Sequence, residues 1–144
     1  MDFTDKIVWI TGASSGIGEA LAKVFAARGA YIILSGRRVE ALEAVAANIA
    51  TDILLLPFET TDYDILPAKV AEAQQWKGRV DVLINNAGIS QRSLALDTDP
   101  NVHHQIVNVD LLAPIWLTQL LLPHMISAGG GHIVGISSVA GRVG

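Results

Sequence analysis

A glycine-rich turn between an apolar run and an amphipathic run is the segment of this chain best suited to bind a ligand. The residues from Lys6 to Ala30 read KIVWITGASSGIGEALAKVFAARGA, with Gly12, Gly16 and Gly18 in the turn. Glycine lets the backbone turn sharply and approach a pyrophosphate, and a helix beginning near Gly16 presents unpaired N–H groups to the ligand. The spacing differs from G-x-G-x-x-G, but a strand before the turn and a helix after it still predict a dinucleotide site.

Two arginines follow the second apolar run, in the sequence Ser35-Gly36-Arg37-Arg38. A dinucleotide fold that prefers NAD usually has Asp or Glu here, which binds the 2′-hydroxyl of the ribose. Guanidinium groups suit a 2′-phosphate instead, so the sequence favours NADP(H) over NAD(H). Arg38 has an alternative interpretation as a solvated residue at the start of a helix.

Three polar segments further along the chain are candidates for the rest of a site. They are Asn85-Asn86-Ala87-Gly88, then Asn108, and then Ile136 to Gly141, which reads ISSVAG. Each also has a structural interpretation when taken alone, because short amides and serines cap strands and form turns, and Asn108 would suit an exposed helix position.

The elements that would position these residues alternate between strands and helices. Five apolar, β-rich runs are predicted strands, at Lys6–Thr11, Tyr31–Ser35, Ile53–Leu56, Val80–Asn85 and Ile133–Ser137. Helical periodicity separates them, which predicts one α/β domain over residues 1–144 with a doubly wound parallel sheet. Parallel strands deliver their carboxyl ends to one crevice, so the glycine turn and the polar segments should meet there.

The helix after the fourth strand carries clear boundary signals. Asp99 is the predicted N-cap and Pro100 the first helical residue, and the glycines at 129–131 should end the helix. Pro114 lies inside it and cannot donate a hydrogen bond to the carbonyl of Asp110, so we expect a kink or local opening between Asn108 and Pro114.

Composition and charge exclude several classes of function. The chain has no cysteine, which excludes disulfides and thiolate chemistry, and its four histidines lack the spacing of metal ligands, so no metal is expected. A net charge of −4 without a basic run argues against nucleic acid as a partner.

The chain also shows no sequence signal for export or for a membrane partner. The first strand begins too early for a secretory leader, which suggests a cytoplasmic protein. The longest apolar stretch, Leu111–Leu122, is interrupted by Pro114 and two polar residues. It is too short to span a bilayer, so we expect a buried helix.

Taken together and in this order, the motifs resemble the short-chain dehydrogenase/reductase family. The four matching parts are the turn TGASSGIG from Thr11 to Gly18, the segment NNAG ending at Gly88, Asn108, and ISSVAG ending at Gly141. The resemblance spans nearly the whole chain. It implies a Rossmann fold and an oxidoreductase that uses a nicotinamide cofactor to interconvert a secondary alcohol and a carbonyl of a small molecule.

The resemblance also implies roles for individual residues in holding the cofactor. Glu59 stands where the family usually has an aspartate that contacts the adenine amino group, and Arg37 stands where NADP-preferring members place a basic residue. Ser15 occupies the position of a second basic residue in many of those members, so that half of the NADP signature is absent. The cofactor-binding residues implied in this way are Gly12, Ser14, Ser15, Gly16, Ile17, Gly18, Arg37, Arg38, Glu59, Thr60, Asn86, Ala87 and Gly88.

For catalysis the family uses Asn, Ser, Tyr and Lys, and the first two match Asn108 and Ser138. Ser138 would hydrogen-bond the substrate oxygen, with Ser137 as the competing assignment, and Asn108 would hold a water in a proton relay. The Tyr-x-x-x-Lys motif expected beyond the serine is missing before Gly144, and neither Tyr31 nor Tyr63 has a lysine four positions on. We therefore expect the N-terminal part of a longer enzyme, inactive alone, or else a non-catalytic dinucleotide-binding module or an inactive fragment.

The family commonly forms dimers through the long helix. The apolar face from Val107 to Leu122 thus has two interpretations, as part of the core or as the contact between two copies in a homo-oligomer. Trp116 would suit either role.

Overall fold

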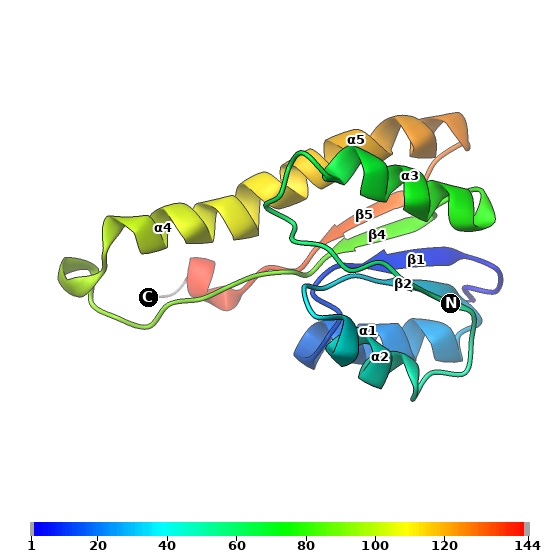
Figure 1. The fold of residues 1–144 in the computed structure, drawn as a ribbon, viewed down its shortest axis with the longest axis horizontal. Coiled ribbons are helices and arrows are strands. Elements are labelled where there is room, and N and C mark those ends of the chain that lie inside the picture. Colours follow the sequence, from blue (N-terminus) through cyan, green and yellow to red (C-terminus); the bar gives the residue numbers. More distant parts are fainter. Residues whose placement is uncertain (1, 143–144) are drawn as a thin grey trace.

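The computed structural model describes residues 2–142 and has three layers, a parallel sheet with helices on both faces (Figure 1). The sheet has the strand order β3-β2-β1-β4-β5, and every pairing is parallel. The strands are β1 (Ile7–Ile10), β2 (Tyr31–Leu34), β3 (Ile53–Leu55), β4 (Val82–Asn85) and β5 (His132–Gly135). The doubly wound sheet and all five predicted strands are confirmed; β1 to β4 are slightly shorter than predicted, and β5 begins one residue earlier and ends two residues earlier.

Helices from different parts of the chain cover the two faces of the sheet (Figure 1). One face carries α1 (Gly16–Ala27) and α2 (Val39–Ala46). The other carries α3 (Leu66–Lys77) and a long rod made of α4 (Pro100–Val107), the π-helical turn η2 (Asn108–Leu112) and α5 (Ala113–Ser127). Two short 3₁₀ turns, η1 (Ala95–Asp97) and η3 (Val139–Gly141), complete the secondary structure of the described residues.

Alternate residues of the inner strands enter opposite cores, because successive side chains of a strand point to opposite faces. In β1, Ile7 and Trp9 belong to the core beneath α3 and α5, whereas Val8 and Ile10 belong to the core beneath α1 and α2. Trp9 is fully buried, and its Nε1 donates to Ser35 Oγ at 2.8 Å. Both faces of the sheet are covered at β1, β2 and β4, which is why these strands are continuous apolar runs, whereas the edge strand β5 is exposed.

The order of the strands reverses beside β1. The chain moves outward from β1 to β2 and β3, then returns to place β4 and β5 on the other side. The connection after β1 leads to one face of the sheet, and the connection after β4 leads to the other. Such a reversal leaves a crevice at the carboxyl ends of the two central strands.

The long rod begins and bends as the sequence predicts. The Asp99 side chain caps α4 by accepting from the N–H of Asn101 at 2.8 Å. The predicted distortion between Asn108 and Pro114 is the π-helical turn, in which the N–H of Ala113 donates to the carbonyl of Asn108. Pro114 has no N–H for the next regular hydrogen bond, which is the physical cause of the irregularity.

The prediction that Leu111–Leu122 is a buried helix is wrong for most of its circumference. A stripe of α5 is buried, made of Ala113, Leu117, Leu121 and Met125. The side away from this stripe is exposed and carries apolar residues, among them Ile115, Trp116 and Ile126, as does Leu111 in the preceding π-helical turn. One face is therefore core and the other exposed, and the role of the exposed face in dimerisation stays a prediction.

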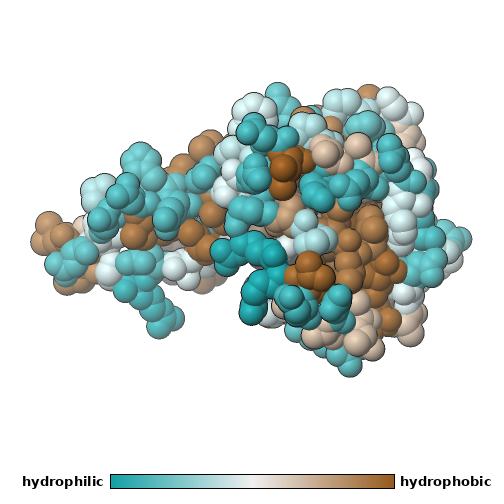
Figure 2. Space-filling model, in the orientation of Figure 1, coloured by the Kyte–Doolittle hydropathy of each residue, from teal (hydrophilic) through white to brown (hydrophobic). Residues whose placement is uncertain are grey.

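The length of the rod exposes its α4 end as well. Its 28 residues, Pro100–Ser127, span about 42 Å at 1.5 Å per residue, several times the length of a four-residue strand. The α4 end consequently stands out from the body as an arm, along which apolar and polar atoms alternate (Figure 2). By length and composition alone, the rod would suffice to cross a membrane.

A buried carboxylate joins the two central strands at their amino ends. Asp81 Oδ2 accepts from the N–H of Ile7 at 2.9 Å, and Asp81 Oδ1 lies 2.6 Å from Arg79 Nη2. The Asp81 side chain is 8% exposed. Removal of this carboxylate would leave the N–H of Ile7 without its acceptor in a buried place.

We expect Asp81→Ala to lower the free energy of unfolding by about 1–3 kcal/mol, because a buried donor loses its acceptor. The matched control is Asp52→Ala, which removes the exposed Asp52 carboxylate 2.9 Å from Lys77 Nζ. An exposed ion pair contributes at most about 1 kcal/mol. Urea denaturation of both variants checks the difference, and equal losses would contradict a special role for Asp81.

Candidate functional site

A cavity of about 460 Å³ occupies the crevice at the carboxyl ends of the strands. The glycine turn lines one side of the cavity, the segments after β2 and β3 line another side, and the segment after β4 closes it. Its volume lies within the range of small-molecule sites. The lining residues are Gly12, Ser14, Ser15, Gly16, Ile17, Gly36, Arg37, Arg38, Phe58, Glu59, Thr60, Asn86, Ala87, Gly88, Ile89 and Val109.

We refer to this space as the cofactor cavity, because it brings together all but one of the residues expected to bind the cofactor. The exception is Gly18, which lies beneath the turn. A Cβ atom on Gly18 would come within 2.3 Å of the Gly12 carbonyl oxygen and 2.6 Å of Asn86 Nδ2. Gly18 is therefore needed for close packing of α1 under the turn, which is the role of the third glycine in a dinucleotide turn.

Sequence reasoning missed four lining residues, Gly36, Phe58, Ile89 and Val109. Each adjoins a residue that was predicted, so adjacency along the chain was the available signal. Phe58, Ile89 and Val109 have apolar side chains, which carry no acid, base or nucleophile that a sequence search would select. They supply flat or apolar surface to the cavity.

The backbone of the turn has a conformation that favours glycine. Gly12 has a φ of +60° and Gly16 a φ of +55°, both in the left-handed region. A Cβ atom on Gly12 would also lie 2.8 Å from the Cα of Ala87. The turn after β1 and the segment after β4 are thus in direct backbone contact.

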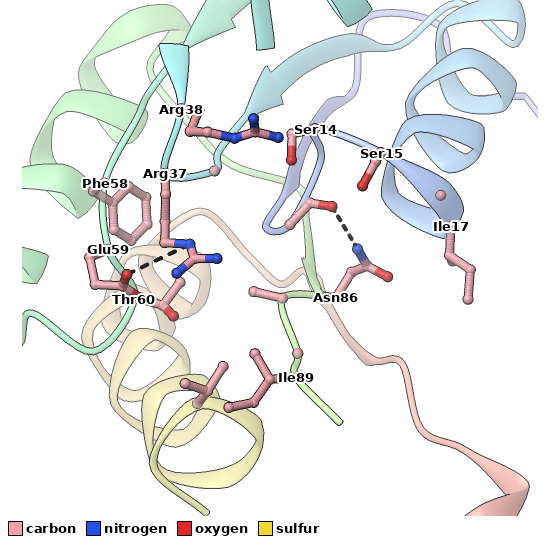
Figure 3. A pocket seen from close by; sticks show the side chains of 16 residues that line it. Ser14, Ser15, Ile17, Arg37, Arg38, Phe58, Glu59, Thr60, Asn86 and Ile89 are labelled. Atoms are coloured by element: carbon pink, nitrogen blue, oxygen red, sulfur yellow. Dashed lines mark hydrogen bonds and ion pairs between the residues drawn. The ribbon is translucent and has the colours of Figure 1, made fainter. Parts of the chain in front are cut away.

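A compact hydrogen-bond network holds these two segments together. The buried hydroxyl of Thr11 accepts from the N–H groups of Asn86 and Ala87, each at 3.0 Å. In return the Asn86 side-chain amide donates to the carbonyls of Thr11 and Gly12, at 3.1 and 3.0 Å (Figure 3). Asn85 has a separate structural role, since its Nδ2 donates to Thr118 Oγ1 of α5 at 3.1 Å.

We expect Thr11→Val to lower the free energy of unfolding by about 1–3 kcal/mol, because two N–H groups lose the oxygen that they share. Valine keeps the shape of threonine, so the loss would come from the hydroxyl. Thr11→Ser is the matched control, because it keeps the acceptor and removes a methyl group. Thermal or urea unfolding of both variants checks this, and a serine variant less stable than the valine variant would refute the role of the hydroxyl.

The two arginines and Glu59 share one side of the cavity. Arg37 is exposed, with its Nε 3.8 Å from Glu59 Oε2, and in Figure 3 it turns toward Glu59 and Thr60. Arg38 occupies the N-cap position of α2 without a side-chain capping hydrogen bond, and it extends in the direction of Ser14 in the same view. A carboxylate and two guanidinium groups thus face the same space.

A second cavity, of about 490 Å³, lies on the other side of the segment after β4. It contains both Ser137 and Ser138, so the competing assignment of the serine stays open. The Ser138 hydroxyl oxygen accepts from the N–H of Ala140 at 3.2 Å. Asn86, Ala87 and Gly88 line both cavities, so this segment is the wall between them.

The structure does not bring Asn108 together with Ser138. Asn108 lies in a different cavity, with His104 and Leu112, although it is at the π-helical turn as expected. Its side-chain oxygen accepts from the hydroxyl of Tyr63, whose ring packs on Trp116 with the centroids 5.9 Å apart. Burial raises the pKa of the Tyr63 phenol, so it stays a hydrogen-bond donor at neutral pH. Sequence reasoning did not find this contact, which joins residues 45 positions apart.

Comparison with known proteins now adds to this geometry. A family model described as short chain dehydrogenase matches residues 6–144. This chain belongs to the short-chain dehydrogenase family. The dehydrogenase/reductase SDR family member 7 of Homo sapiens is 42% identical over 149 residues, which cover 99% of this chain and 44% of that protein. The member 7B of Mus musculus is 41% identical and covers 96% of this chain and 45% of that protein.

Solved structures of short-chain dehydrogenases share the fold. One from Streptomyces avermitilis superposes with a TM-score of 0.91 at 34% identity, covering 98% of this chain and 52% of that one. A metagenomic short-chain oxidoreductase in complex with NADP superposes with a TM-score of 0.87 at 34% identity, covering 99% and 66%. The chain thus spans less than half the length of the two curated relatives and about half to two thirds of these structures.

The described residues fit the nicotinamide dinucleotide that a short-chain dehydrogenase binds. Gly12 and Gly18 pack against neighbouring protein atoms without room for a Cβ atom, whereas a Cβ atom on Gly16 would meet nothing within 4 Å, so the turn is open to a ligand at Gly16. The turn leads into the amino end of α1, where backbone N–H groups favour a pyrophosphate.

Proposed function

We propose that this chain forms the cofactor-binding part of an NADP(H)-dependent oxidoreductase that interconverts a secondary alcohol and a carbonyl. The observation that carries the proposal is the presence of Arg37 and Arg38 in the same cavity as the glycine turn. In a bound dinucleotide the adenosine ribose is joined directly to the pyrophosphate through its 5′ oxygen, so its 2′ position lies close to the glycine turn. A guanidinium on that side suits a 2′-phosphate, and the metagenomic relative in complex with NADP agrees with this choice.

Each part of the site has a role under this proposal. The cofactor would supply the hydride. The turn from Gly12 to Gly18 would bind its pyrophosphate, and Glu59 would accept from the adenine amino group. Ser138, or Ser137 beside it, would hydrogen-bond the substrate oxygen in the second cavity. The wall from Asn86 to Gly88 would place cofactor and substrate on neighbouring sides of one segment.

A general acid for the carbonyl oxygen is the component that these residues do not provide. Tyr63 donates to Asn108 and lies outside the second cavity, and no lysine follows it at the fourth position. We therefore propose that the 144-residue chain binds cofactor without turnover. A non-catalytic dinucleotide-binding module is the second candidate function, and the absence of a general acid among these residues favours it. Consumption of NADPH with ketone substrates by a longer form of the protein would favour the enzyme.

We expect the chain to bind NADPH more tightly than NADH, and Arg37→Ala to remove most of that preference. Loss of a phosphate–guanidinium contact costs about 1.5–3 kcal/mol, a loss of NADPH affinity of about 10–150-fold, with NADH nearly unaffected. Titration calorimetry with both nucleotides checks this. Arg28→Ala is the matched control, because it removes an exposed arginine at the far end of α1. Equal affinity of the unmodified chain for the two nucleotides would refute the NADP preference.

We expect Glu59→Gln to raise NADPH affinity by about threefold to tenfold. The Glu59 carboxylate lies 3.8 Å from Arg37 and would compete with a 2′-phosphate for the guanidinium. Glutamine keeps an oxygen acceptor for adenine and removes the charge, so NADH affinity should change little. The gain should shrink as salt rises, because both charges are exposed. A matching rise in NADH affinity would contradict competition at the 2′ position.

A further inference from the structure

Asp110 holds the outer end of the wall between the two cavities. Its Oδ1 accepts from the N–H of Ile89 at 2.8 Å. The same oxygen would lie 3.4 Å from a Cβ atom on Gly88. Asp110 comes from the π-helical turn, 21 residues further along the chain, so the contact joins two separate segments.

The position of Asp110 on the rod explains why its carboxylate reaches the wall. Asp110 lies three residues before Ala113, which begins the buried stripe that continues through Leu117 and Leu121. The wider π-helical turn changes the spacing along the stripe, and the hydrogen bond to Ile89 shows that Asp110 points toward the segment after β4. At its position the rod has passed the end of the sheet, and Asp110 therefore meets the segment after β4 instead of a strand. Because Asp110 faces a backbone N–H of that exposed segment and not the apolar core, a charged residue is tolerated at this position.

The wall is held from two sides by oxygen acceptors of different kinds. Its inner end is held by the buried Thr11 hydroxyl, which accepts from Asn86 and Ala87. The chain just beyond its outer end is held by the exposed carboxylate of Asp110, which accepts from the N–H of Ile89. Ile89 lines the cofactor cavity and Asp110 lines the second cavity, so the contact crosses the boundary between them.

We propose that Asp110 is a positioning residue that orders Gly88 and Ile89 as a wall for the dinucleotide. The ligand part of this proposal rests on the proposed function. Because Asp110 and Ile89 are exposed, loss of the contact leaves no buried polar group without a partner, and the fold should persist. The effect should instead be local, as faster opening of the segment and weaker binding of a dinucleotide in the cofactor cavity.

The test compares Asp110→Ala with Asp110→Asn in the 144-residue chain. Alanine removes the acceptor, whereas asparagine keeps an oxygen at the same distance from the backbone. Asp64→Ala is the control for charge, because Asp64 is an exposed carboxylate in the turn before α3. Amide exchange at Ile89 is followed by NMR without ligand, and NADPH affinity is measured by calorimetry.

We expect the Ile89 amide to exchange about tenfold faster in Asp110→Ala and within about threefold of the unmodified chain in Asp110→Asn. Amides of β1 should keep their protection in both, which separates a local effect from unfolding. The Kd for NADPH should rise about fivefold in Asp110→Ala and stay nearly unchanged in Asp64→Ala.

Unchanged Ile89 exchange in Asp110→Ala would overturn the proposal whatever the nucleotide result. Faster exchange with unaltered NADPH affinity would overturn the positioning role for the ligand. If the unmodified chain binds neither NADPH nor NADH, the proposed function fails, and the exchange data still decide whether Asp110 orders the segment. If the β1 amides also lose protection in Asp110→Ala, that variant is unfolding and is replaced by Asp110→Glu, with Asp110→Asn as its partner. Glutamate keeps the charge but moves the oxygen, so faster Ile89 exchange in Asp110→Glu and not in Asp110→Asn would support the proposal, and equal exchange in the two variants would overturn it.

Discussion

The contact between Thr11 and Asn86 is the interaction on which the site depends. It joins the carboxyl ends of β1 and β4, where the order of the strands reverses and the two connections leave toward opposite faces. Two connections that diverge in this way leave a crevice between them. The backbone N–H and C=O groups at the base of the crevice need hydrogen-bond partners. Thr11 accepts two N–H groups with one hydroxyl, and the Asn86 amide returns two hydrogen bonds to the turn. Direct hydrogen bonds between the two segments therefore form the floor of the crevice.

This floor demands small residues around it. Gly12 approaches the backbone of Ala87, and Gly18 approaches both the Gly12 carbonyl and the Asn86 amide, at distances that leave no room for a Cβ atom. These two glycines thus bring α1 close enough to direct its amino end at the cavity, where a pyrophosphate would bind.

Charge is distributed at the rim and not at the floor. Arg37 and Asp110 are exposed and Glu59 is half-buried, and each contacts a group from another segment. Exposed charges lose little solvation when they make such contacts, so they tune ligand choice and local order more than global stability. The buried carboxylate Asp81 has the opposite role, because it lies at the amino ends of the strands, away from the cavities, and joins β1 to the start of β4.

The sequence by itself determined the layered architecture, the glycine turn and the position of the helix distortion. These features follow from local causes: apolar runs form buried strands, glycine permits a φ that other residues avoid, and proline lacks the N–H that a regular helix needs. Only the tertiary structure decided which side chains meet. It placed Asn108 against Tyr63 and away from Ser138, Glu59 beside Arg37, and Asp110 on Ile89. It also exposed most of α5, although its composition resembles that of a core helix. Contacts between distant segments depend on how far each element extends past its neighbours, and no local pattern of residues encodes that length.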